Sequence, residues 1–550
     1  MNFDTLFNYL FDDTWQTSVG LFGSELVLCA TIVALLIIRL VDLDRWCPAY
    51  WVALIGTLVS FFLACQQFSD LKATRLDELP TLLFTGLLVY DQFTVFFRLF
   101  LLLFLILVIA LTVVSEIVDR EDGSDFYTLL LGSTIGMMLM VSTNNFLILF
   151  LGVEMTSVPS YVMVGFLKTR RLASEAALKY VVYGAGAAGV MLYGTSLLVG
   201  LLGTTDLSVM ASQLHLLFEE SDALGVRSED PMLRTLALGA LMVLVGLAFK
   251  LSLVPFHFWC PDAFEGASAE VAGFLSVASK AAAFALLVRF CLALVGNDPG
   301  VMADFNLRLG IGLGIVAAIT TTFGNLAAYT QTNMKRLLAY STIAHAGYML
   351  MAVAAMMVIL NAPAPTERIA FDQTEQGARC LEGLLYYLAV YLFMNLAAFA
   401  IVALIRNGIG SEEIEDYAGL GWQAPILGIP MLFCMFSLIG LPPFGGFFAK
   451  LMIFSSLMYA GAVHWSMWLV LAVGGLNTVF SLFYYLRVLK AMFLTPRPQE
   501  ARSFRIEFLP VGAYLVMISA PILLTGFFPW FPDRLSQTAN YVASVLIRPF

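Results

Sequence analysis

Ionisable side chains lie inside several apolar stretches of this chain that are long enough to cross a lipid bilayer. They are Glu154, Lys250, Lys280 and Lys450, and His345 lies in a further such stretch. Burying an ionisable group at that depth is costly in free energy, so such groups are rare and usually mark an ion or proton path. Glutamate, lysine and histidine all exchange protons, and the set therefore predicts proton transfer as the chemistry of this chain.

Proton transfer through hydrocarbon needs groups that exchange protons near neutral pH and are joined by water or hydroxyl groups. Burial disfavours the charged form of lysine, whereas a nearby carboxylate favours it. We therefore expect Glu154 and Lys250 to form a modulating ion pair, Lys280 to be the central relay and Lys450 to be the last relay before exit. Imidazole titrates close to physiological pH, so His345 is expected to bridge Lys280 and Lys450. Three residues are expected to help hold the connecting water: Tyr340, Ser341 and Thr342.

Each of these assignments has a structural alternative. Glu154 could accept hydrogen bonds from neighbouring helices, and Lys450 could only satisfy carbonyl groups freed by a nearby helix break. His345 could be a structural hydrogen-bonding group. His257, which follows another expected break, could be a cap or a proton-uptake group.

The composition indicates a polytopic membrane protein. Of the 550 residues, 60% are hydrophobic and only 12% are charged, which exceeds the needs of a soluble core. The first apolar run, residues 20–39, lacks a basic start and a cleavage site of small residues, so we expect a retained span and not a signal peptide. At roughly twenty residues per crossing, the chain has about fourteen spans. They are expected near residues 19–41, 48–68, 94–114, 126–142, 144–166, 176–202, 233–260, 269–296, 307–330, 335–360, 381–405, 424–459, 465–495 and 508–529.

Several other classes of site are disfavoured. The seven cysteines stand singly, without the spacing of an iron-sulfur, zinc or dithiol site, and are expected to be inert packing residues. Glycines 184, 186, 189 and 194 lie inside an apolar helix and are expected to pack helices closely, not to bind a nucleotide. The net charge of -10 gives no sign of a nucleic-acid surface.

Spans seven and twelve are each expected to be broken within the membrane. Pro255 follows Lys250 in the seventh span, and Gly440, Pro442 and Pro443 precede Lys450 in the twelfth. Proline removes a backbone donor and clashes with the preceding turn, while glycine loosens a helix. Free carbonyl groups and half-helix ends then face the protein interior, where they hold water or stabilise charge.

The two broken spans are five spans apart, so they cross the bilayer in opposite directions. This layout predicts an inverted repeat in which spans four to eight are mirrored by spans nine to thirteen. The expected fold is an all-α polytopic membrane protein with about fourteen transmembrane helices, two inverted five-helix repeats and two discontinuous helices. Its expected sections are residues 1–125 with three spans, 126–300 and 301–500 with the two repeats, and 501–550 with the last span and a tail.

Basic residues predict the orientation of the chain. They are about twice as frequent in the loops after odd-numbered spans, which places those loops in the cytoplasm and both termini outside. Lys179 and Lys335, near helix starts on the cytoplasmic side, are expected to be lipid or topology anchors, with proton uptake as the alternative. The acids between spans seven and eight are expected to be solvated loop residues: Asp262, Glu265 and Glu270. Polar insertions at 207–231 and 361–379 are expected to be exposed outer loops, with a short surface helix as an option.

Six motifs follow one another along the chain. They occupy residues 151–159, 177–180, 249–259, 279–281, 335–345 and 441–450. Together they resemble the antiporter-like membrane subunits of respiratory complex I, over roughly residues 90 to 500. In that family, subunits L, M and N share a glutamate on the fifth span, lysines on the seventh and eighth, and a lysine or glutamate on the twelfth. Lys450 differs from the glutamate of subunit M, and the long lateral helix of subunit L is not expected, so the pattern is most similar to the subunit N branch.

This resemblance implies a proton-translocating subunit of an NADH:quinone oxidoreductase in a bacterial inner membrane, with both termini periplasmic. Quinone reduction in partner subunits would drive this translocase, with subunits K and M as neighbours. No redox centre is expected in this chain, while the assembly uses NADH, FMN, iron-sulfur clusters and quinone. The alternatives are a subunit of a multi-subunit sodium/proton antiporter, whose members share the pattern, and a membrane scaffold with vestigial charges.

Overall fold

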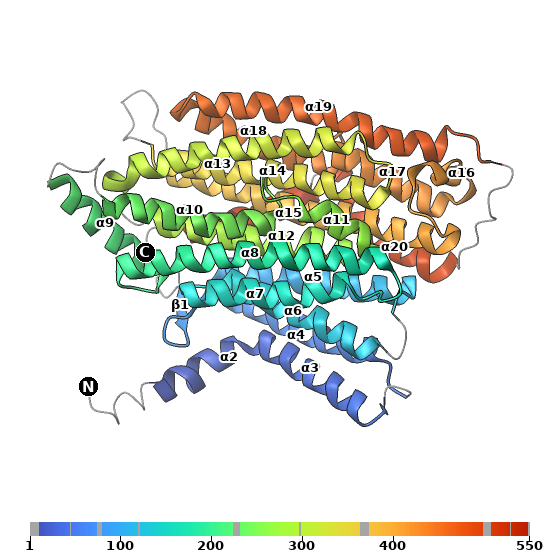
Figure 1. The fold of residues 1–550 in the computed structure, drawn as a ribbon, viewed down its shortest axis with the longest axis horizontal. Coiled ribbons are helices and arrows are strands. Elements are labelled where there is room, and N and C mark those ends of the chain that lie inside the picture. Colours follow the sequence, from blue (N-terminus) through green and yellow to red (C-terminus); the bar gives the residue numbers. More distant parts are fainter. Residues whose placement is uncertain are drawn as a thin grey trace.

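A computed structural model describes residues 10–43, 46–73, 80–118, 122–223, 231–295, 299–362, 373–498, 508–528 and 530–547. Most of these residues form long helices that lie side by side (Figure 1). Thirteen of the described helices are long and apolar enough to cross a membrane. The predicted all-α polytopic class is confirmed.

The elements are numbered in chain order. The N-terminal part contains a π-helical turn Asp13–Ser18, α2 Val19–Leu21, α3 Gly23–Leu40, α4 Ala49–Ala73, β1 Thr81–Leu83, β2 Leu88–Tyr90 and α5 Gln92–Ser115. Next come α6 Gly123–Ser142, α7 Phe146–Val164, α8 Arg171–Leu202, α9 Leu207–Ala223, α10 Pro231–Leu251, α11 Trp259–Gly266 and α12 Ala269–Val295. The second repeat contains α13 Pro299–Ala328, α14 Met334–Leu360, α15 Gln373–Ile409, a 3-10 turn Ile414–Tyr417, α16 Leu420–Gln423, α17 Pro425–Ile439, α18 Gly445–Val463 and α19 Ser466–Phe493. Two further helices follow, α20 Phe508–Phe527 and α21 Trp530–Ile547.

Each predicted span corresponds to one helix or to a pair of helices. Spans seven and twelve are divided into α10 and α11 and into α17 and α18, which confirms both predicted breaks. In Figure 1 the first broken span runs from α10 toward α11, and the second runs from α17 toward α18 in the opposite direction. This is the arrangement that an inverted repeat requires. The fourteenth span is α20, whose apolar stretch Pro510–Gly526 is shorter than the others.

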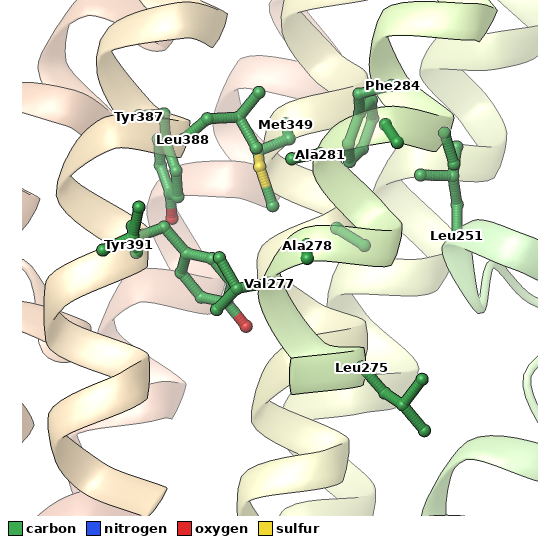
Figure 2. Close-up of a cluster of buried hydrophobic side chains, with 14 of the residues drawn as sticks. Leu251, Leu275, Val277, Ala278, Ala281, Phe284, Met349, Tyr387, Leu388 and Tyr391 are labelled. Carbon is green, nitrogen blue, oxygen red and sulfur yellow. The ribbon is translucent and has the colours of Figure 1, made fainter. Parts of the chain in front are cut away.

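Three helices form the centre of the bundle. Within the most apolar stretch of each helix, the share that is buried inside the protein is 100% in α12, 94% in α14 and 89% in α15. Figure 2 shows part of this core, where Tyr391 of α15 lies beside Val277 of α12. Helices in a bilayer are held together by close packing and by interhelical hydrogen bonds. The most enclosed helices are also those that carry Lys280 and His345, so the core and the candidate residues coincide.

Polar caps and close glycine contacts set the positions of these helices. Asn333 caps α14, because its Oδ1 accepts from the backbone N–H groups of Lys335 and Arg336 at 3.0 and 3.2 Å. A Cβ on Gly184 would lie 1.9 Å from the hydroxyl group of Tyr161, and one on Gly194 would lie 2.6 Å from a side-chain carbon of α10. Close packing is thus confirmed at these two glycines. It is wrong for Gly186 and Gly189, where a Cβ would have nothing within 4 Å.

Some elements differ from the sequence expectation. The insertion at 207–231 contains the helix that was expected as an option, α9, but it is not fully exposed, because α9 buries Leu207, Met210, Leu214 and Phe218 along one face. Residues 224–230 lie outside the described residues, as do 363–372 of the second insertion, and α15 begins before the predicted span, at Gln373. The hairpin of β1 and β2 and the helix α21 were not predicted. The packing role expected of the cysteines is wrong for two exposed ones, Cys29 and Cys65.

A buried ion pair that was also not predicted joins α3 to α5. Arg98 Nε donates to Glu25 Oε1 at 2.7 Å, and its Nη1 donates to the carbonyl oxygen of Leu21 and to Gln67 Oε1, each at 3.0 Å. The Arg98 side chain is 1% exposed and the Glu25 side chain 0%. Removing one member of such a pair leaves an uncompensated buried charge, whereas replacing both with apolar residues is often neutral.

Arg98→Leu is therefore expected to lower the free energy of unfolding by about 3–5 kcal/mol. Thermal unfolding in detergent measures the change, and the double variant Arg98→Leu, Glu25→Leu is expected to recover most of the loss. Arg39→Leu serves as the control, because Arg39 pairs with Asp125 while 42% of its side chain is exposed. Equal unfolding temperatures for Arg98→Leu and Arg39→Leu would contradict this account of the buried pair.

Candidate functional site

The first helix break leaves the ammonium group of Lys250 unpaired. Helix α10 ends one residue after Lys250, and the indole Nε1 of Trp259 donates to the carbonyl oxygen of Phe249 at 2.9 Å. The backbone N–H of Val254 donates to Thr320 Oγ1 of α13 at 3.1 Å, which ties the break to the second repeat. An uncharged group thus satisfies the carbonyl near the break. Lys250 Nζ is buried and, in the described part of the chain, has no hydrogen-bond partner.

Glu154 lies on α7 and is partly exposed. It was expected to form a modulating ion pair with Lys250, but Lys250 Nζ donates a hydrogen bond to none of the described residues. The structure therefore shows no direct hydrogen bond between the two side chains, and the modulating role expected of Glu154 stays a prediction. Helices α7 and α10 both pack against α8.

One face of α14 connects the two remaining lysines. Lys280 of α12 is 1% exposed, and its Nζ donates to the carbonyl oxygen of Thr342 at 3.3 Å. Thr342, His345 and Tyr348 follow at every third residue of α14, so they lie on one side of the helix. At the far end of this row, Lys450 Nζ lies 4.6 Å from the centre of the Tyr348 ring. The structure therefore places His345 between Lys280 and Lys450.

Hydroxyl groups from two other helices surround His345. Its Nδ1 lies 2.6 Å from Tyr387 Oη of α15, and its Nε2 lies 3.2 Å from Tyr485 Oη of α19. Tyr485 Oη in turn lies 2.5 Å from Ser341 Oγ. The Tyr391 ring is centred 5.2 Å from the imidazole. Both ring nitrogens of His345 therefore face groups that can donate or accept a proton.

The three residues expected to hold water differ in their roles. Ser341 enters the hydroxyl network through Tyr485. Thr342 Oγ1 donates back to the carbonyl oxygen of Leu338 at 2.7 Å, so Thr342 meets Lys280 through its backbone. Tyr340 is partly buried against the hydrophobic core.

The sequence reasoning missed a polar ladder on α15. Asn395 Nδ2 donates to Tyr391 Oη at 3.0 Å and to Ser276 Oγ of α12 at 2.6 Å. Tyr387, Tyr391 and Asn395 recur at every fourth residue within an apolar span, which places them on one helix face. This periodicity is the sequence signal from which the polar ladder could have been predicted. Such polar side chains inside a span are expected to face the bundle interior.

Lys450 satisfies carbonyl groups at the second helix break. Its Nζ donates to the carbonyl oxygens of Leu438 and Ile439, the last residues of α17, at 3.2 and 2.8 Å. Gly440 follows with a φ of 85°, a conformation that favours glycine. A cation is also stabilised by the negative end of the α17 dipole. Lys450 therefore does satisfy carbonyl groups freed by the second break, as its structural alternative expects. At the first break, the indole N–H of Trp259 is the donor to the freed carbonyl group.

His257 contacts a different part of the bundle. Its ring lies 4.4 Å from the ring of Phe323 on α13 in an edge-to-face arrangement, and its Nδ1 has no hydrogen-bond partner among the described residues. These contacts do not join His257 to the α14 row.

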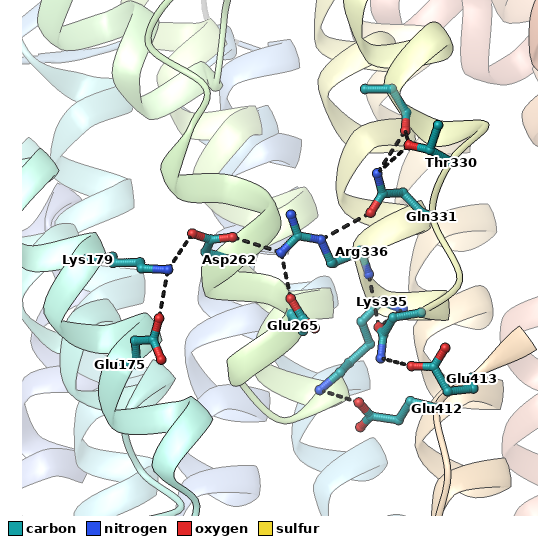
Figure 3. Close-up of polar contacts among 12 residues, drawn as sticks. Glu175, Lys179, Asp262, Glu265, Thr330, Gln331, Lys335, Arg336, Glu412 and Glu413 are labelled. Carbon is teal, nitrogen blue, oxygen red and sulfur yellow. Dashed lines mark hydrogen bonds and ion pairs between the residues drawn. The ribbon is translucent and has the colours of Figure 1, made fainter.

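Charged residues at the starts of α8, α11 and α14 form what we call the ion cluster (Figure 3). Asp262 accepts from Lys179 Nζ at 2.9 Å and from Arg336 Nη1 at 2.8 Å, and Arg336 Nη1 also lies 2.6 Å from Glu265. Lys179 further pairs with Glu175 at 2.9 Å. Asp262 and Glu265 were expected to be solvated loop acids, and this is wrong because both lie on helix α11 in ion pairs. The expectation of a lipid or topology anchor at Lys179, which is 42% exposed, stays a prediction.

Glu270 and Lys335 are enclosed beside this cluster. Each side chain is 1% exposed, so Glu270 is not a solvated loop acid and Lys335 is not a lipid anchor. Lys335 Nζ donates to the carbonyl oxygen of Ala267 at 2.6 Å and pairs with Glu412 at 2.9 Å. Folding brings the starts of α12 and α14 together, which covers both groups.

Comparisons with known proteins agree with this architecture. A family model described as NADH:quinone oxidoreductase/Mrp antiporter, transmembrane, matches residues 143–362 and 370–481. The chain is 37% identical over 539 residues to subunit N of an NADH-quinone oxidoreductase from Chlorobium chlorochromatii, covering 97% of this chain and 96% of the relative. The subunit N of an Anaeromyxobacter species is 39% identical over 464 residues, covering 82% of this chain and 83% of the relative.

Solved structures show the same fold. A chain in respiratory complex I from Thermus thermophilus with bound aureothin is 30% identical, with a TM-score of 0.66, and the match covers 92% of this chain and 97% of that one. A chain in the Mrp complex from a Dietzia species is 19% identical, with a TM-score of 0.72, covering 96% of this chain and 100% of that one. The second likeness shows the fold alone.

Proposed function

The chain belongs to the NADH:quinone oxidoreductase/Mrp antiporter family of membrane subunits, and we propose that it translocates protons as the N-type subunit of an NADH:quinone oxidoreductase. Its similarity to relatives named subunit N, over most of both chains, favours this role over an antiporter subunit. The observation that carries the mechanism is the α14 row, in which His345 lies between Lys280 and Lys450.

Protons pass along this row in three steps. Lys280 releases a proton toward the hydroxyl groups around His345, and the imidazole accepts it at one nitrogen and releases it from the other. Lys450 receives the proton at the second break, where the freed carbonyls of α17 stabilise its charged form. Because charges repel at close range in a low dielectric, a proton on one lysine favours release from the next. Glu154 stabilises the charged form of Lys250 from a distance.

Partner subunits supply the driving force in this proposal. The redox chemistry of NADH, FMN, iron-sulfur clusters and quinone belongs to those subunits, and its energy reaches this chain as electrostatics and helix motion through neighbouring membrane subunits. Glu154 borders an exposed apolar face of α7, which fits cover by a neighbour such as subunit K or M. That face consists of Leu147, Leu151, Met155, Val158 and Val162.

The same proposal sets the membrane orientation. Basic loops place the ion cluster on the cytoplasmic side of a bacterial inner membrane. An even number of spans returns the chain to its starting side, so both termini are periplasmic. Residues 126–300 and 301–500 then act as two inverted half-channels, flanked by an N-terminal section and a C-terminal helix.

Transport by the purified assembly tests the function. In proteoliposomes, oxidation of NADH by quinone is expected to move protons across the membrane at the same rate with sodium or potassium as the only metal cation. The measurement records quinone reduction and internal pH together. Sodium-driven proton flux without electron transfer would instead identify an antiporter.

A further inference from the structure

We propose that Glu270 takes up protons at the cytoplasmic start of α12 and supplies them toward Lys280. This inference rests on the proposed function and adds the group that loads the relay. Glu270 is one residue into α12, and Lys280 lies ten residues further along the same helix. At about 1.5 Å per residue, the two are separated by about 15 Å along the helix axis.

The burial of Glu270 is difficult to explain by a structural role. An acid in the first turn of a helix stabilises the helix dipole, and an exposed carboxylate serves that purpose. Glu270 is only 1% exposed, and its Oε2 has no hydrogen-bond partner in the described part of the chain. A buried polar atom without a partner destabilises the folded state. A carboxyl group that alternates between charged and protonated forms gives this arrangement a use.

Lys335 lies close to Glu270, because its Nζ donates to the carbonyl oxygen of Ala267, three residues before Glu270, and both side chains are enclosed. The other groups near the carboxylate are uncharged hydroxyls from three directions: Ser115 at the end of α5, Ser268 before α12 and Tyr514 of α20. Lys335 also pairs with Glu412, which is 13% exposed. Glu412 and Lys335 thus connect the enclosed Glu270 with the cytoplasmic face, and the charge on Lys335 stabilises the carboxylate after its proton has left.

A polar route continues inward from Glu270. Ser276 lies on α12 between Glu270 and Lys280, about 9 Å from Glu270 along the axis. Its hydroxyl accepts from Asn395, which also donates to Tyr391 beside His345. Both Ser276 and Asn395 are 0% exposed. Water must bridge Glu270 to Ser276, and again Ser276 to Lys280, which lies one helical turn further along α12. The hydrogen bond from Asn395 holds the Ser276 hydroxyl in place.

Pumping by the assembled complex in proteoliposomes tests this inference. Glu270→Gln is expected to lower the pumping rate at least roughly fivefold, as removal of a proton-transfer group does. The loss should deepen as the pH on the cytoplasmic side rises and shrink as it falls, because uptake without a loading group depends on bulk protons. Glu265→Gln, which removes a similar charge from the ion cluster, is the matched control and should pump normally.

A second measurement does not depend on the assembly of Glu270→Gln. Infrared difference spectra of the working wild-type complex should contain a buried carboxyl band that Glu270→Asp shifts and Glu265→Gln leaves unchanged. A loss of pumping that does not vary with pH, or spectra without that band, would overturn the inference. Normal pumping by Glu270→Gln together with failure of Lys280→Met overturns the inference alone. Normal pumping by both variants overturns the proposed function as well.

Discussion

Replacing Lys280 with methionine is expected to reduce proton pumping at least roughly tenfold while the complex still assembles. Methionine has a similar length and suits an apolar interior, but it has no proton to give. Lys280 is 1% exposed in the most buried helix of the bundle, and it meets the α14 row at the carbonyl oxygen of Thr342. Removing it therefore interrupts the relay before His345. Pumping and quinone reduction in proteoliposomes measure the effect.

Lys179→Met is the matched control for this experiment. The Lys179 side chain is 42% exposed and pairs with Glu175 and Asp262 at the surface. Surface pairs of this kind contribute roughly 0–1 kcal/mol, so the control complex should assemble and pump normally. Normal pumping by Lys280→Met would leave the buried charges without a role in transport and would favour a scaffold function.

Lys450→Arg and Lys450→Ala should both reduce pumping at least roughly tenfold. This pair of variants separates the two roles of Lys450. Arginine retains the positive charge and the donors that satisfy the carbonyls of Leu438 and Ile439, but it does not release a proton in proteins. A relay role therefore predicts that arginine fails in pumping although it preserves the helix break.

Stability measurements complete the comparison. Lys450→Ala leaves buried carbonyls without their donor, so it should unfold at a lower temperature than the wild type, whereas Lys450→Arg should unfold closer to it. Pumping by Lys450→Arg at the wild-type rate would show that Lys450 only satisfies the freed carbonyls, and the last relay would have to be another group.

Local signals explain what the sequence predicted well. The length of an apolar run fixes a span, and proline or glycine breaks a helix wherever it stands, so the spans and both breaks were predictable. A charged residue inside an apolar run is equally visible, which is why Lys280 and Lys450 were found. Tyr387 and Tyr391 recur at every fourth residue of α15, which is a similar signal. They were not predicted as site residues, because aromatic residues are also common in helix packing.

Contacts between distant helices explain what the sequence did not predict. Glu270 follows a polar link in the sequence and was therefore expected to be a loop acid, because its burial depends on how α12 packs against α14. The pairing of Asp262 with both Lys179 and Arg336 likewise requires three helix starts to meet. Glu154 and Lys250 were expected to form an ion pair, yet Lys250 Nζ has no hydrogen-bond partner among the described residues, and such side-chain distances depend on how α7, α8 and α10 pack.

The positions of water between the buried groups test the central claim most directly. The measurement is a structure of the assembled complex, with neighbouring subunits present, at a resolution that shows individual water molecules. The account predicts a continuous hydrogen-bonded line of water and hydroxyl groups from Lys280 through His345 to Lys450. Dry apolar packing on both sides of His345, or lysine side chains directed into lipid, would contradict it.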